Sequence, residues 1–203
     1  MQSLPHKPAI TDYPIHPLLA ERWSTRSFAD RSISPEVLGS LMEAARWSPS
    51  SSNNQPWRFV VTRREETDDF AAMVKVLGEG NQKWAYRASL LLVGIAAKLT
   101  PRGTPNAYGW YDLGQSVAHM SIQATALGLH LRQMGGFDKD QARTLLQVPD
   151  DFDPVVAIAI GYQSTSDHLP PDIQERELTA RVRQPLSEML FYRRWGNTAA
   201  DPE

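Results

Sequence analysis

The sequence predicts a single domain of mixed helices and strands, and three observations support this. The chain has 203 residues, 41% of them hydrophobic, which is enough for one substantial core. Leu90–Ala97 and Val155–Gly161 are apolar runs of strand length, rich enough in branched residues to be buried on both faces. Residues 35–45 and 110–128 instead carry apolar side chains at helical spacing.

The N-terminal part of the chain is expected to be irregular. Residues 1–17 contain four prolines and no hydrophobic period, so they predict an arm, with a short helix around His16–Glu21. Ser34-Pro35-Glu36 then predicts a helix start. The serine side chain can cap the first turn of the helix, and the proline lacks only an N–H that would be unpaired there. The negative charge of the glutamate favours the positive end of the helix dipole.

The stretch Ser48–Phe59, SPSSSNNQPWRF, predicts an ordered polar loop between a helix ending near Trp47 and a strand at Trp57–Thr62. Its Ser and Asn side chains compete for backbone hydrogen bonds, and Pro56 favours an extended residue before it. The density of donors and acceptors suits a flat polar heterocycle or an anion. An ordinary helix-to-strand connection is the alternative.

The middle of the chain predicts a helix at Thr67–Leu77, ended by Gly78 and Gly80, before the strand Leu90–Ala97. Residues 98–109 are rich in Pro and Gly and could form a mobile lid.

The helix predicted from Trp110 to Gly128 has a narrow apolar stripe that could serve the core or a dimer interface. Its members are Leu113, Val117, Met120, Ala124 and Leu127. His119 is interpreted as a packed or satisfied polar residue rather than a base.

The last third predicts a strand at Leu129–Met134, a helix capped by Asp138 and reaching about Gln147, and the strand Val155–Gly161. From Tyr162 the prolines and charges predict an extended surface segment, with a short helix at Leu186–Tyr192. Residues 197–203 are expected to be a tail.

Composition and motifs exclude several classes of protein. A net charge of −2 without polybasic runs argues against nucleic-acid binding, and no run is apolar enough to span a membrane. The absence of cysteine fits a cytoplasmic location, and five scattered histidines make a metal site improbable. No catalytic triad, GxSxG, GxGxxG or phosphate-binding P-loop motif occurs.

Four polar clusters remain to be explained: Arg22–Arg26, Ser50–Gln55, Asn81, and the pair Arg181 and Arg183. The arginines around Ser24 could bind an anion bidentately, although a solvated turn is the alternative. Arginines 181 and 183 alternate on an extended chain and so point to the same side. Arginine and hydroxyl side chains that can hold a ligand, without a nucleophile or a metal site, predict that a bound cofactor supplies the reactivity.

These clusters lie in motifs that together resemble the FMN-dependent nitroreductase family over residues 18–196. The motifs, in order, are RWSTRSF, SPSSSNNQPWRF, NQKWAYRASLLLVG, LRQMGGFD, VAIAIGY and ARVRQPL. The resemblance implies an α+β fold with a central, mostly antiparallel sheet flanked by helices. It also implies an intertwined homodimer with two FMN sites at the subunit interface.

The resemblance implies that the first motif holds FMN from one subunit. Arg22 would face the phosphate, Arg26 would lie near the N1–O2 edge of the ring, and Arg181 and Arg183 would complete the phosphate clamp. The residues of the first motif implied in binding are Arg22, Trp23, Ser24 and Arg26.

Further contacts are implied for the ring. Asn81 would hydrogen-bond its pyrimidine side, and the amide near Gly135 and Gly136 would face N5. Gly135 stands where an acidic residue can occur, and Trp84 where a lysine can occur, which removes a positive charge. The residues expected largely from the other subunit are Pro49, Ser50, Ser51, Asn53 and Gln55.

The implied function is an oxidoreductase in which NADH or NADPH reduces FMN through N5, and a nitroaromatic, quinone or activated enal then accepts the hydride in the same cleft. No residue is assigned as a catalytic acid or base, because water can supply the remaining proton. Two alternatives stay open: an FMN-storing or FMN-sensing protein with little turnover, and a dimeric interaction module that has lost its cofactor.

Overall fold

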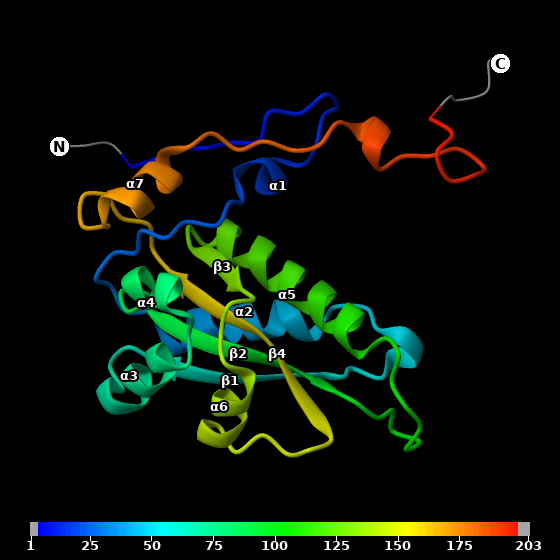
Figure 1. Cartoon of the computed structure of the whole chain (residues 1–203), viewed down its shortest axis with the longest axis horizontal. Helices are drawn as coiled ribbons and strands as arrows, with labels where there is room; N and C mark the ends of the chain where they lie inside the picture. Colours follow the sequence, from blue (N-terminus) through cyan, green and yellow to red (C-terminus); the bar gives the residue numbers. More distant parts are fainter. Residues whose placement is uncertain (1–3, 199–203) are drawn as a thin grey trace.

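A four-stranded antiparallel sheet lies at the centre of the computed structural model, which describes residues 4–198 (Figure 1). The strands lie side by side in the order β1-β2-β4-β3, and every neighbouring pair is antiparallel. Their bounds are β1 Trp57–Arg63, β2 Leu90–Ala97, β3 His130–Met134 and β4 Phe152–Gly161. With helices on both faces, this confirms the predicted α+β fold and its antiparallel sheet.

Strand β2 separates two hydrophobic clusters, one on each face of the sheet. Successive side chains of a strand point to opposite faces, so its apolar residues alternate between the clusters. Leu91, Val93 and Ile95 enter one cluster, whereas Leu90, Leu92 and Ala96 enter the other. Burial on both sides explains why the strand is an unbroken apolar run.

One face is covered by helices α2 (Pro35–Arg46) and α5 (Gly109–Ala126). The predicted cap of α2 is confirmed, because the Ser34 hydroxyl accepts a hydrogen bond from the Val37 N–H. The stripe on α5 serves the core: Leu113, Val117, Met120 and Ala124 are all buried. His119 is exposed rather than packed, which corrects that expectation, and Leu127, the residue just after α5, is also exposed in the single chain.

The opposite face is covered by α3 (Thr67–Lys75), α4 (Glu79–Ala85) and α6 (Lys139–Leu145). Asp138 caps α6 as predicted, accepting from two backbone N–H groups. Gly80 does not end α3 but lies inside α4, a helix that the sequence did not predict. Gly78 caps this short helix and separates it from α3.

Strand β4 begins three residues earlier than predicted and contains a proline. Pro154 pairs with Ile95, and the register shifts between Gly94 and Ile95, which leaves Val155 as the extra residue of a bulge. Proline has no N–H to donate to the hydrogen-bond ladder. A bulge therefore allows Pro154 to stand inside an interior strand.

The two ends of the chain form a third layer beyond α5 (Figure 1). Residues 4–16 contain no helix or strand and precede α1 (Pro17–Glu21). The Ala9 N–H donates a hydrogen bond to the Ala20 carbonyl of α1. The C-terminal segment runs beside them and continues past the end of the sheet (Figure 1). The predicted tail, 197–203, lies almost wholly outside the described residues.

The segment after Tyr162 differs from its prediction. It contains α7 (Pro171–Leu178), in which Ile173 and Glu177 are four residues apart and both buried. The helix expected at Leu186–Tyr192 is only a 3-10 turn at Leu186–Glu188.

Candidate functional site

Three predicted arginines lie together at the third layer. Arg22 is half-buried, and burial together with the charges of Arg181 and Arg183 lowers its pKa. The Arg22 guanidinium also donates to the hydroxyl of Ser24 over 3.3 Å. Arg181 is held in place by the carbonyls of Lys7 and Ala20.

This arginine cluster has the chemistry of a site for a dianionic phosphate. Like charges held close together are stabilised when an anion enters between them, and a guanidinium fork matches phosphate oxygens. The structure thus brings together Arg22, Ser24, Arg181 and Arg183, which lie up to 161 residues apart in sequence.

Trp23, between two of these residues, is buried. Its ring lies 4.5 Å beneath the Lys7 ammonium and meets the His130 ring edge-on. The side chain therefore positions the loop, and only the backbone of Trp23 is free for a contact with a ligand. Its predicted role in binding remains a prediction.

A cavity of about 280 Å³ lies beside this cluster, between α4, the end of β3 and α7. It brings together Arg26, Asn81 and Gly136 from three predicted motifs. Other residues that line it include Trp84, Arg132 and Arg176.

The floor of this cavity is fixed by glycine and asparagine. The Gly136 carbonyl accepts from the Gly78 N–H at 2.9 Å and from the Asn81 amide at 3.0 Å. A Cβ on Gly136 would lie 3.4 Å from that amide nitrogen, which is a tight contact. Gly135 and Gly136 are exposed, so a flat ligand can approach their backbone closely.

Arg26 is held by a buried carboxylate that the sequence did not reveal. The Glu177 carboxylate accepts from the Arg26 backbone N–H at 2.9 Å and lies 3.6 Å from its guanidinium. It also accepts from the Thr25 hydroxyl. The spacing of Ile173 and Glu177 on one side of a helix was the signal that could have identified this residue.

Arg132 and Arg176 also line the cavity, and neither was predicted from the sequence. In β3 the Arg132 side chain shares the face of Met134, which packs in the cluster under α4, so strand alternation would have placed it there. Arg176 comes from α7, the helix that was not predicted.

The polar loop after α2 lies elsewhere and is highly structured. The Ser51 N–H donates to the buried Asp112 carboxylate, and Ser50 Oγ accepts from the Gln55 N–H. Asn53 and Gln55, like Ser52, adopt positive φ angles, a conformation that non-glycine residues keep only where surrounding structure demands it. Pro49 is exposed beside them.

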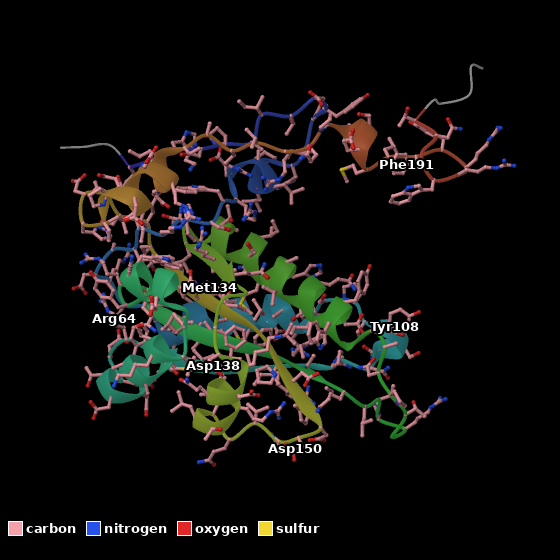
Figure 2. The ribbon with its side chains drawn as sticks, viewed as in Figure 1. Arg64, Tyr108, Met134, Asp138, Asp150 and Phe191 are labelled. Carbon is pink, nitrogen blue, oxygen red and sulfur yellow. The ribbon has the colours of Figure 1, made fainter. Side chains whose placement is uncertain are left out.

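Within one chain this loop does not meet the cavity. In Figure 2, Tyr108 lies on the right of the view, whereas Met134, at the end of β3, lies left of the centre of the view. The loop instead borders a separate hollow of about 290 Å³ with Arg58 and residues of the 98–109 segment. The predicted residues thus form two separate groups within one chain, because the two hollows share no lining residue.

His130 has a shifted pKa, which makes the stability of the protein depend on pH. Its ring donates from Nδ1 to the Trp23 carbonyl over 3.4 Å, with Glu177 and Arg22 nearby. Burial, the largest effect, lowers the pKa of His130 below its usual 6.5, and Arg22 adds to this, whereas Glu177 and the hydrogen bond oppose it.

We expect the free energy of unfolding to fall as the pH drops below about 6.5, because the unfolded chain then binds a proton that native His130 does not. Replacing His130 by Asn should make this dependence shallower in urea unfolding at a fixed protein concentration. Replacing the exposed His119 by Asn is the matched control and should not. Parallel curves for wild type and the His130→Asn variant would contradict the assignment.

Two features are absent from residues 4–198. No group of three or more metal-ligating side chains occurs there. No helix in that range has both the length and the apolar character needed to span a membrane.

The chain is similar to proteins whose descriptions point to one family. The model of the nitroreductase family matches residues 19–83 and 68–162. A solved structure described as an oxidoreductase containing FMN is 37% identical and superposes with a TM-score of 0.87, covering 97% of this chain and all of the other.

Two further relatives agree. A nitroreductase family protein of Clostridium difficile is 26% identical with a TM-score of 0.68, over 87% of this chain and 96% of that one. A putative NADH dehydrogenase/NAD(P)H nitroreductase of Archaeoglobus fulgidus is 25% identical over 79% of this chain and 95% of its own length. Since the family model covers most of the sequence and the folds superpose, this chain belongs to the nitroreductase family.

Proposed function

We propose that the chain is an NAD(P)H-dependent FMN oxidoreductase that works as an intertwined homodimer, with residues 18–196 as its FMN-binding domain. The observation that carries the proposal is the arginine cluster, in which Arg181 and Arg183 lie close enough to lower the pKa of the half-buried Arg22, next to the cavity of Arg26 and Asn81. A phosphate joined to a flat polar ring matches this pair of sites. The similarity to an oxidoreductase containing FMN supports the same cofactor.

A second chain is needed to complete the proposed site. The polar loop at 49–55 would reach the FMN of the partner, because it does not line the cavity of its own chain. Exposed aromatic residues support a dimer: Trp110 and Tyr111 on α5 are 55% and 67% exposed, and Trp195 on the projecting C-terminal segment is 91% exposed. Phe191 lies on the same segment, beyond the rest of the chain (Figure 2).

The chemistry that bound FMN would supply is hydride transfer, the movement of two electrons and one proton from NADH or NADPH to the second substrate. The chain's own residues would bind FMN and orient its ring. Arg22, Arg181 and Arg183 would hold the phosphate, and Asn81 would fix the ring against the backbone of Gly135 and Gly136. An open face at these glycines admits nicotinamide and acceptor in turn.

The proposed acceptors are nitroaromatics, quinones and activated enals, and the 98–109 segment beside the polar loop would select among them. We also propose a cytoplasmic location, for which the cysteine-free sequence is the support.

The test is an absorbance spectrum of the purified protein with FMN, taken anaerobically before and after NADH or NADPH. We expect a bound flavin band that the pyridine nucleotide bleaches and that a quinone restores. A bound flavin that neither nucleotide bleaches would indicate storage or sensing instead of turnover. A protein that binds no FMN would contradict the proposal.

A further inference from the structure

Arg132 is a half-buried cation of the cavity that has no carboxylate partner among the described residues. Its guanidinium donates from Nη1 to the Ser24 carbonyl at 2.5 Å and stands over the Trp84 ring, 5.4 Å from its centroid. Its Nε is buried without a hydrogen-bond partner among the described residues. Within residues 4–198 it makes no ion pair.

The charge of this guanidinium is poorly compensated. Burial, reinforced by Arg26, lowers the pKa of Arg132 to about 10, so the group stays protonated near neutral pH. The carboxylate of Glu177 is already engaged by the Thr25 hydroxyl and by the backbone and guanidinium of Arg26. Arg26, Arg132 and Arg176 line the cavity with one carboxylate, that of Glu79. The lining therefore keeps a surplus of positive charge even with Arg26 paired to Glu177.

A cation that is withdrawn from water and faces a cavity favours a ligand that carries, or gains, negative charge there. Adding a hydride to a flavin ring leaves one extra negative charge on the ring. Trp84 stands where the family resemblance allows a lysine, and it supplies no charge itself. The Arg132 guanidinium over the Trp84 ring supplies a positive charge instead.

We propose that Arg132 is a further cofactor-binding residue, which together with Arg26 stabilises the reduced state of the flavin held in this cavity. The inference rests on the proposed function and assigns a role to a residue outside the predicted FMN contacts. It predicts that Arg132 acts on the reduction potential more than on the affinity for oxidised FMN, since the phosphate is held by the separate arginine cluster.

The experiment measures the two-electron midpoint potential of bound FMN by spectroelectrochemistry in the full-length holoprotein. The Arg132→Met variant keeps the bulk of the side chain and removes its charge. We expect the reduced state to be disfavoured about tenfold, the loss of one charge-assisted contact, which lowers the potential by about 30 mV. The Arg132→Lys variant restores the charge and should keep the potential close to that of wild type.

Arg63→Met is the matched control. Arg63 is also half-buried and also donates to a backbone carbonyl, that of Ile33, but it does not line the cavity. We expect this variant to have the wild-type potential. A shift of the same size would show that loss of any buried arginine has this effect, and would overturn the inference.

The outcomes separate this inference from the proposed function. If wild type binds FMN that NAD(P)H reduces, but Arg132→Met leaves the potential unchanged, the proposed function stands and the role of Arg132 is wrong. If Arg132→Met does not fold, the same comparison is made with Arg132→Gln and Arg132→Lys. Equal potentials in these two variants would likewise overturn the role. If wild type binds no FMN, both proposals fail.

Discussion

Replacing Arg22 with alanine should weaken the binding of FMN by about 1.5–3 kcal/mol, the value of a lost hydrogen bond to a charged group. This corresponds to roughly a tenfold to 150-fold rise in the dissociation constant. The reason is that Arg22, Arg181 and Arg183 share one anion site, in which Arg22 is the most buried. Titration followed by flavin fluorescence measures the change.

A matched control distinguishes this local effect from a general loss of charge. Lys75 on α3 is exposed, and it borders neither the cavity nor the arginine cluster. The Lys75→Ala variant removes one positive charge as well, and we expect its affinity for FMN to equal that of wild type. An Arg22→Ala variant that binds as tightly as the control would contradict the phosphate clamp.

The second large effect is expected when two inactive variants are combined in one dimer. Arg26→Ala alters the cavity and Asn53→Ala alters the polar loop, so each homodimer should bind FMN poorly. If each site takes Arg26 from one chain and Asn53 from the other, a heterodimer of the two variants has one wild-type site. We expect it to recover about half of the wild-type FMN content.

The mirror-image heterodimer is the control. It pairs a wild-type chain with a chain that carries both substitutions, so the same changes are present in a different arrangement. Sites shared between chains would then each lack one residue, and FMN content should stay low. With differently tagged chains both heterodimers can be isolated, and the reverse pattern would show that each site is built within one chain.

Local signals predicted much of the fold. The cap at Ser34, the cap at Asp138 and the apolar run Leu90–Ala97 each depend on neighbours in sequence, and all three appear as expected. The helix α7 was missed because its inward face holds only Ile173 and the charged Glu177, so the apolar period is absent. Glu177 can be buried because Thr25 and Arg26 satisfy it, and these partners are about 150 residues away.

The site was predictable only in part, for a related reason. The resemblance identified motifs, but the meeting of Arg22 with Arg181 and Arg183 depends on two distant ends of the chain lying side by side. Arg132 shows the limit most clearly. A lone arginine on a short strand carries no local signal of function, and its importance follows only from what surrounds it in the cavity.

The most direct test of the central claim is a crystal structure of the protein with FMN bound. We predict one FMN for each chain, lying between two chains. The phosphate should lie at Arg22, Arg181 and Arg183, and the ring should lie in the cavity at Asn81, with side chains of residues 49–55 arriving from the partner. Electron density for FMN enclosed by a single chain, or located away from this cavity, would contradict the account.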